Sequence, residues 1–137
     1  MSTPQNLLPN ELHTGVSDLD AQHEGLFSEM QAIKNALMSP DADIPAGLRR
    51  LTQLELDMAS HFAWEETQAA ALAIAFAAHA AEHQRLLALM HSKIAEAHTG
   101  AGNIPALLVF LDRCFEMHVK HFDQSLGMLL RGTRDRG

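Results

Sequence analysis

Five of the nine histidines in this chain recur on apolar stripes with helical spacing, and two carboxylates share those stripes. The seven positions are His23, His61, His79, His83 and His118, together with Glu65 and Asp123. Burying imidazoles and carboxylates costs free energy unless the groups pair with one another or bind a metal ion. Because seven nitrogen and oxygen ligands exceed what one ordinary metal ion needs, the pattern predicts a buried site for two ions.

Length and composition restrict the chain to one helical domain. Its 137 residues can bury one hydrophobic core, and the abundance of Ala and Leu among them favours helix. The formal net charge of -7 argues against a nucleic-acid partner, which usually requires a basic surface. We find neither a signal peptide nor an uncharged apolar run of about 20 residues, so we expect a cytoplasmic protein without a membrane partner. The single cysteine, Cys114, excludes an internal disulfide and is expected to be a buried apolar residue.

Periodic apolar segments predict four helices in a single domain over residues 1–137. Residues 1–15, which contain two prolines and a glycine, predict an extended N-terminal arm. The predicted helices cover about 18–38, 45–69, 74–98 and 104–130. Long helices with short connections favour an all-α fold, an antiparallel up-down-up-down four-helix bundle.

The predicted reversal between the second and third helices lacks the usual turn residues. Residues 67–78 are rich in Ala and contain no Gly, Pro, Asn or Asp to make a turn. We place the turn near residues 69–74, because a four-helix bundle requires a reversal there. The alternative is one continuous helix that exchanges its partner segment with a second chain.

Two of the predicted helices each carry a pair of candidate ligands four residues apart. His79 and His83 form one pair, and His61 and Glu65 form the other. Residues four apart lie on the same helix face, so each pair can bind one ion. A buried glutamate strengthens this interpretation, since Glu is almost never fully buried without a partner.

The remaining candidates fit less regularly. His118 and Asp123 are five residues apart, about 140° around an α-helix, which is poor for one ion but allows the carboxylate to reach a second. His23 is weak evidence by itself. The chain offers imidazole and carboxylate without a thiolate cluster, a donor set that suits iron, zinc or manganese. Four further histidines are predicted to lie on the surface or in the arm: His13, His91, His98 and His121.

Four short motifs occur in a fixed order over nearly the whole chain. They are Gly15–Phe27 around His23, His61–Glu66, Phe76–His83 and His118–Asp123. In combination they resemble the hemerythrin family, specifically its single-domain bacterial members. That resemblance implies a four-helix bundle with two iron ions and an oxo or hydroxo bridge, which binds O2 reversibly for storage or delivery and is not an enzyme. It assigns His79, His83 and His118 to one iron, His23 and His61 to the other, and Glu65 and Asp123 to both as bridges.

Other functions fit part of the pattern. The same centre would suit O2 or redox sensing, or iron buffering, and an oxygen-using enzyme or a redox protein could be its partner. A zinc-dependent hydrolase could use His79, Glu82 and His83, which match the His-x-x-Glu-His pattern. A ferritin-like oxidase is disfavoured because the chain contains no Glu-x-x-His. A metal-free helical interaction module would leave the histidines merely buried.

Overall fold

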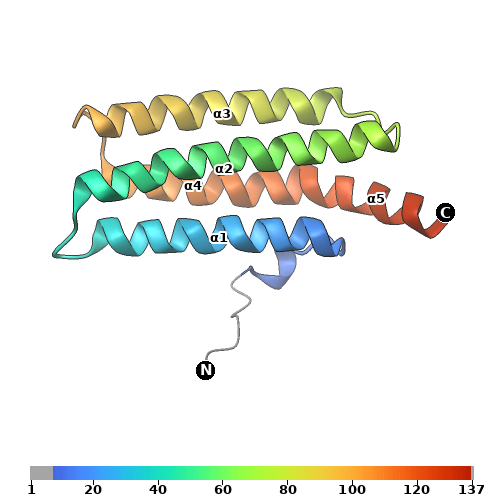
Figure 1. The fold of residues 1–137 in the computed structure, drawn as a ribbon, viewed down its shortest axis with the longest axis horizontal. Coiled ribbons are helices and arrows are strands. Elements are labelled where there is room, and N and C mark those ends of the chain that lie inside the picture. Colours follow the sequence, from blue (N-terminus) through green and yellow to red (C-terminus); the bar gives the residue numbers. More distant parts are fainter. Residues whose placement is uncertain (1–7, 137) are drawn as a thin grey trace.

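The computed structural model describes residues 8–136, in which every regular element is helical. Figure 1 shows long rods lying side by side, the last of them built from three consecutive elements. The elements are η1 (Asn10–Leu12), α1 (Ser17–Met38), α2 (Ile44–Ala71), α3 (Ala77–His98), α4 (Ile104–His118), η2 (Val119–Asp123) and α5 (Gln124–Arg136). The prediction of an all-α helical bundle is therefore confirmed.

Neighbouring rods pack in a closed ring around one core. α2 contacts both α1 and α3, and α4 contacts both α3 and α1. In Figure 1 the α1–α2 and α3–α4 connections lie at one end, while the α2–α3 connection and the C-terminus lie at the other. Side chains at the middle of any rod therefore face side chains from the other three.

Side-chain caps fix the starts of two helices where the sequence predicts them. The Asp43 carboxylate accepts a hydrogen bond from the backbone N–H of Ala46, and the Asn103 amide oxygen accepts one from Ala106. Each cap satisfies a backbone donor that the first helical turn leaves free, and each helix has proline in that turn. Gly100, with φ of +78°, follows α3 and ends it.

The segment before α1 differs from the predicted extended arm. It contains the single 3-10 turn η1, and Leu8 and Leu12 are buried against the bundle. The Thr14 backbone N–H and hydroxyl both donate to the Asp20 carboxylate at 2.7 Å, which ties the segment to α1. Burial of two leucines holds this segment close to the bundle. Residues 1–7 of the predicted arm lie outside the described residues.

The chain reverses between α2 and α3 without any of the usual turn residues. Ala73 adopts φ of 55°, the left-handed conformation that normally favours glycine. The Ile74 N–H then donates to the Ala69 carbonyl at 2.9 Å, as in the Schellman type of helix end. Leu72, Ile74 and Phe76 pack on an apolar cluster with Leu126, and this packing overrides the helical preference of the alanines. α3 consequently begins at Ala77, three residues after the predicted start.

Candidate metal centre

All seven predicted site residues meet inside the bundle, in the half toward the α2–α3 connection, and each is buried. His23 comes from α1, His61 and Glu65 from α2, His79 and His83 from α3, His118 from α4, and Asp123 from η2. His23, His83, Glu65 and Asp123 have 0% of their surface exposed. The side chains form two overlapping groups that could each hold a metal ion, and both groups contain Glu65 and Asp123.

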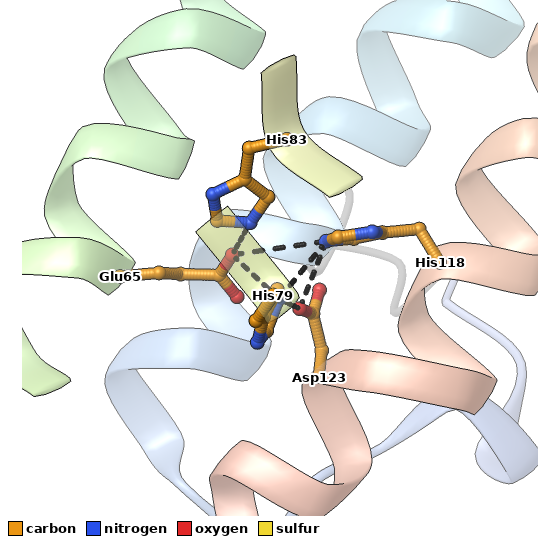
Figure 2. Close-up of side chains that lie close together, drawn as sticks. All are labelled: Glu65, His79, His83, His118 and Asp123. Carbon is orange, nitrogen blue, oxygen red and sulfur yellow. Dashed lines mark hydrogen bonds and ion pairs between the residues drawn. The ribbon is translucent and has the colours of Figure 1, made fainter. Parts of the chain in front are cut away.

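The larger group joins three histidines to the two carboxylates. Figure 2 shows these five side chains converging on one small region from α2, α3 and the rod formed by α4 and η2. His83 Nε2 lies 2.9 Å from Glu65 Oε1. His79 Nε2 and His118 Nε2 each lie 3.0 Å from Asp123 Oδ1, and the two nitrogens are 3.3 Å apart. Five donor atoms are thus directed at one point.

The smaller group lies on the other side of the carboxylates. His23 Nε2 is 2.9 Å from Asp123 Oδ2, and His61 Nε2 is 3.7 Å from Glu65 Oε2. These are the second oxygens of the two carboxylates, whose first oxygens face the larger group. Each carboxylate therefore presents one oxygen to each group, which is the arrangement of a bridging ligand. This group has four donors where the larger has five.

The donor distances test whether metal ions fit. Ligands about 2.1 Å from an ion and at right angles to each other are about 3.0 Å apart, close to most of the short distances in the larger group. Nine buried nitrogen and oxygen atoms of His23, His61, Glu65, His83, His118 and Asp123 have no partner in hydrogen-bond geometry. Such atoms are costly unless something satisfies them. Two cations between the donors would satisfy seven of these atoms, all except the Nδ1 atoms of His23 and His118, whose rings face the carboxylates with Nε2. The residues therefore fit a pair of metal ions.

A π-helical turn explains how His118 and Asp123 reach the same site. η2 replaces the α-helical pattern over Val119–Asp123. In a π-helix the hydrogen bonds join residues five apart, so a residue and the fifth after it lie almost one above the other. The expected offset of about 140° between these two side chains assumes an uninterrupted α-helix and is wrong for this segment. The closely spaced ligands are a consequence of the added residue in the turn.

Two polar residues outside the predicted set orient the histidine rings. His61 Nδ1 lies 2.6 Å from Gln22 Oε1, and His83 Nδ1 lies 2.9 Å from Glu66 Oε2. An acceptor on Nδ1 leaves the Nε2 lone pair of the same ring free for a metal ion and fixes the ring's direction. The sequence alone offered a weak signal for both, since each residue is adjacent to a predicted ligand, His23 or Glu65.

Aromatic rings cover the histidines of the larger group. Phe62 stacks on His83 with centroids 3.9 Å apart, Phe76 stacks on His79 at 4.2 Å, and Phe122 lies parallel to His118 at 5.5 Å. Stacking restricts the rings and keeps water from their faces. The sequence predicts an apolar shell around the site formed by Leu26, Phe27, Phe62, Phe115 and Phe122. Of these, Leu26, Phe62 and Phe115 are buried, whereas Phe27 and Phe122 are half-buried.

A small cavity adjoins both groups and extends into the apolar core. It has a volume of about 20 Å³, and His61, His118 and Asp123 line one side. The other walls are apolar or sulfur-containing: Met30, Met58, Phe62, Leu86, Met90, Leu111, Cys114 and Phe115. A volume of this size holds one water or one molecule of two or three atoms.

Burial and the neighbouring charges shift the pKa values in opposite directions. Burial lowers the pKa of His61 to about 3 and that of His83 to about 4, and it raises the pKa of Glu65. Burial opposes charge on His118 and Asp123 too, but their mutual attraction prevails. It raises the pKa of His118 to about 9 and holds the pKa of Asp123 well below its usual range. The metal-free site thus holds protons that a bound cation would displace.

The remaining histidines and Glu82 lie outside both groups. His91 Nδ1 pairs with Glu55, His98 Nε2 with the Thr52 hydroxyl, and the exposed His121 lines an outer pocket. Glu82 pairs with Arg85 on the same helix, and this hydrogen bond lowers the pKa of its carboxyl. A carboxylate engaged in this way is poorly placed as the base of a zinc hydrolase.

Cys114 is only half-buried, contrary to the expectation of a fully buried residue. Its thiol lies on α4, where the helix faces α3 and an outer pocket opens between them. Burial raises the pKa of the thiol, so it is predominantly protonated at neutral pH.

Comparison with known proteins adds no relative. The chain matches no protein-family model, no curated protein and no solved structure. Among the described residues, no helix has both the length and the apolar character needed to cross a membrane. The functional interpretation consequently depends on the geometry of the centre itself.

Proposed function

We propose that this chain is a hemerythrin-like protein that binds O2 reversibly at a non-haem di-iron centre. The observation that carries the proposal is the pair of donor groups that share Glu65 and Asp123. The connections at alternating ends of the bundle support an antiparallel up-down-up-down arrangement, in which all four rods can supply ligands at the same height. Two ferrous ions would supply the electrons that O2 accepts on binding and returns on release.

The donor set favours iron over tetrahedral zinc. Structural zinc sites are almost always four-coordinate, whereas the larger group offers five donors at distances close to those of right-angled ligands. Neutral imidazoles and carboxylates suit ferrous and ferric ions. His79, His83 and His118 would hold one ion and His23 and His61 the other, with Glu65 and Asp123 between them.

Charge balance makes the pair tolerable in an apolar core. Two divalent ions bring four positive charges, while Glu65, Asp123 and one bridging hydroxide bring three negative charges. The site is then nearly neutral, which limits the cost of its burial. The neutral state of His61 and His83 costs nothing further, because burial already holds their pKa values low.

The smaller group has one donor fewer than the larger, which would leave a coordination position for a ligand. The cavity of about 20 Å³ is lined by its His61, by the shared Asp123 and by His118 of the larger group. The cavity walls are predominantly apolar, so they admit O2 and offer few proton donors. Exclusion of water and protons would favour release of O2 in its original form.

Anaerobic iron loading tests the proposal. We expect about two irons per chain, and exposure to air should produce a charge-transfer colour that fades under vacuum. Glu65→Ala should lose the second iron, because it removes a shared ligand. Glu116→Ala is the matched control, since this carboxylate is exposed on α4 and pairs with Lys120. A chain that binds iron but oxidises at once, without a reversible colour, would exclude O2 carriage and favour a redox or iron-buffering role.

Two alternatives have distinct signatures. A sensing role would use the same centre and would require a partner that responds to its oxygenated form. A zinc hydrolase would contain zinc and lose peptidase activity in Glu82→Gln, but the pairing of Glu82 with Arg85 disfavours it.

A further inference from the structure

Two separate spaces lie on either side of one thin wall near the metal centre. The inner space is the cavity of about 20 Å³ beside His61. The outer space is an open pocket of about 430 Å³, lined by side chains of α3, α4 and η2. Three residues line both spaces: Leu86, Cys114 and His118.

We propose that small uncharged molecules reach the centre from the outer pocket through this wall, and that the size of the Cys114 side chain sets their rate of entry. The proposal rests on the proposed function only for the identity of the physiological ligand, O2. The route itself is a property of the packing between α3 and α4.

One residue of the wall, Cys114, can move aside by a change of its side-chain conformation. His118 is 5% exposed and is held by the Asp123 carboxylate on one side and by the Phe122 ring on the other. Leu86 is also buried, at 5%. Cys114 is the smallest of the three and is half-buried. Side chains of this kind change rotamer in picoseconds to nanoseconds, so brief openings beside Cys114 need no movement of the helices.

A rival route on the opposite side of the bundle is narrower. A cavity of about 10 Å³, lined by residues of α1, α2 and α4, shares Met30 and Leu111 with the inner space. It is half the volume of the inner cavity and far smaller than the outer pocket. Lys34 and Asp112 line it and form an ion pair of 3.7 Å. A molecule entering here must pass a charged pair and then a tighter space.

The outer pocket and its apolar wall disfavour the passage of charged molecules. Arg85, paired with Glu82, and Arg113 line it together with the apolar Met117. An anion can associate with the arginines, but its passage beyond Leu86 would require loss of its hydration in an apolar wall. Uncharged molecules of two or three atoms avoid that cost. The outer pocket is thus open to many kinds of molecule, but only small uncharged ones can cross the wall.

Substitution at Cys114 tests the route with two readouts. The first is the rate of nitric oxide binding to the ferrous protein. The second uses zinc-loaded protein, in which dissolved O2 relaxes the NMR signals of the methyl groups of Met30, Met58 and Met90 that line the inner cavity. We expect Cys114→Ala to increase the nitric oxide rate and the O2-induced relaxation. Cys114→Val and Cys114→Leu should lower the rate progressively, by about tenfold for Leu.

Controls separate size from chemistry and position. Cys114→Ser should stay near the wild-type rate, since it removes the thiol and keeps the size. Val109→Leu adds a similar bulk on an exposed face of α4 that borders neither space, and should change nothing. Lys34→Trp narrows the rival route and should likewise leave both readouts unchanged.

The outcomes distinguish the two proposals. Rates that do not follow side-chain size at position 114, or that fall in Lys34→Trp instead, overturn the entry route. Should Cys114→Leu fail to load metal, the alanine and valine variants still give the size dependence. If the protein binds no iron, the zinc-loaded measurement still tests the route, and only the proposed O2 function fails.

Discussion

The two halves of the bundle core affect the free energy of folding in opposite directions. The half near the α1–α2 connection is closed by aliphatic side chains such as Ile33, Leu51 and Leu54, all with 0% exposure. The half toward the α2–α3 connection instead contains nine buried nitrogen and oxygen atoms without hydrogen-bond partners, and all but the Nδ1 atoms of His23 and His118 face the centre. The apolar half lowers the free energy of folding by removing hydrocarbon from water. The polar half raises it unless cations satisfy its donors.

Because the packing of the apolar half involves no ligand, the fold can hold the site in position before any ion binds. Each rod contributes apolar residues to one half and ligands to the other, so packing in the first half aligns the ligands in the second. Folding then predisposes the donor atoms to lie near one another before any ion binds. Such preorganisation leaves more of the ions' binding energy for affinity.

Removal of the ions should have the largest effect on stability, and that effect should be confined to the polar half. A chelator is expected to lower the free energy of unfolding by about 4 kcal/mol or more, the value for ions present at a thousand times their dissociation constant. Hydrogen exchange should then accelerate around Glu65 and His79, while amides around Leu51 stay protected. An unchanged melting temperature after chelation would show that the buried donors need no metal.

A cavity in the apolar half should destabilise the fold and spare the site. Leu54→Ala removes a fully buried side chain and is expected to cost about 2–5 kcal/mol. Iron stoichiometry should remain that of the wild type. Leu56→Ala is the matched control on the same helix, because Leu56 is 58% exposed and should change stability by no more than about 0.5 kcal/mol. Loss of metal in Leu54→Ala would show that the two halves are not independent.

The pH dependence of stability should have opposite signs in metal-free and loaded protein. In the metal-free chain the pKa of His118 is raised from 6.5 to about 9, so the stability it contributes is present below pH 6.5 and is lost as pH rises toward 9. The raised pKa of Glu65 acts in the same direction. His61 and His83 are neutral in both states above pH 6.5 and contribute no slope. The free energy of unfolding should therefore fall between pH 6.5 and 9.

Metal binding reverses that trend, because the ions displace these protons and bind more tightly as pH rises. Denaturation curves at several pH values, with and without iron, measure both slopes. Glu65→Gln cannot ionise, so the metal-free slope should become shallower in that variant. A metal-free chain that grows more stable toward pH 9 would contradict the protonation states inferred for the site.

Loss of a ring-orienting partner should weaken metal binding without abolishing it. Glu66→Ala removes the acceptor at His83 Nδ1 and is expected to lower metal affinity about 10- to 100-fold. Both ions should still bind at saturating iron, since no donor atom is lost. Competition with a chelator of known affinity measures the change, with Glu116→Ala as the control. An affinity equal to that of the wild type would leave Glu66 without a role in the centre.

Much of the arrangement follows from sequence because its signals are local. Helical spacing of apolar residues predicts the rods, and the predicted starts near residues 45 and 104 agree with the caps that Asp43 and Asn103 form. Ligands four residues apart, such as His79 and His83, are apparent for the same reason. These features depend on regular α-helical geometry, which the chain obeys over most of its length.

The rest depends on departures from that geometry or on contacts between rods. No feature of the local sequence at Val119–Asp123 predicts a π-helical turn. The alignment of His118 with Asp123 is therefore visible only in the structure. Gln22 and Glu66 are polar residues beside ligands, and their acceptor roles arise from rings on other helices. The shared wall at Cys114 likewise exists only after α3 and α4 have packed.

The smallest expected effect concerns the reversal between α2 and α3, where the helical preference of the alanines opposes the turn. Ala73 holds φ of 55°, which costs a residue with a side chain about 1 kcal/mol relative to glycine. Ala73→Gly should relieve this strain, and the greater freedom of glycine in the unfolded chain offsets part of the gain. We expect a net stabilisation of somewhat less than about 1 kcal/mol.

Two controls show whether the change in stability of Ala73→Gly reflects the backbone conformation at residue 73. Ala71→Gly, at the end of α2 where the backbone is helical, should instead destabilise by about 0.5–1 kcal/mol. Urea denaturation resolves the two signs, and sedimentation reports whether the chain exchanges helices with a second copy. If Ala73→Gly destabilised the protein as Ala71→Gly does, position 73 would be helical in solution. The two ligand-bearing helices α2 and α3 would then form one rod, and His79 would have to reach Glu65 of another chain.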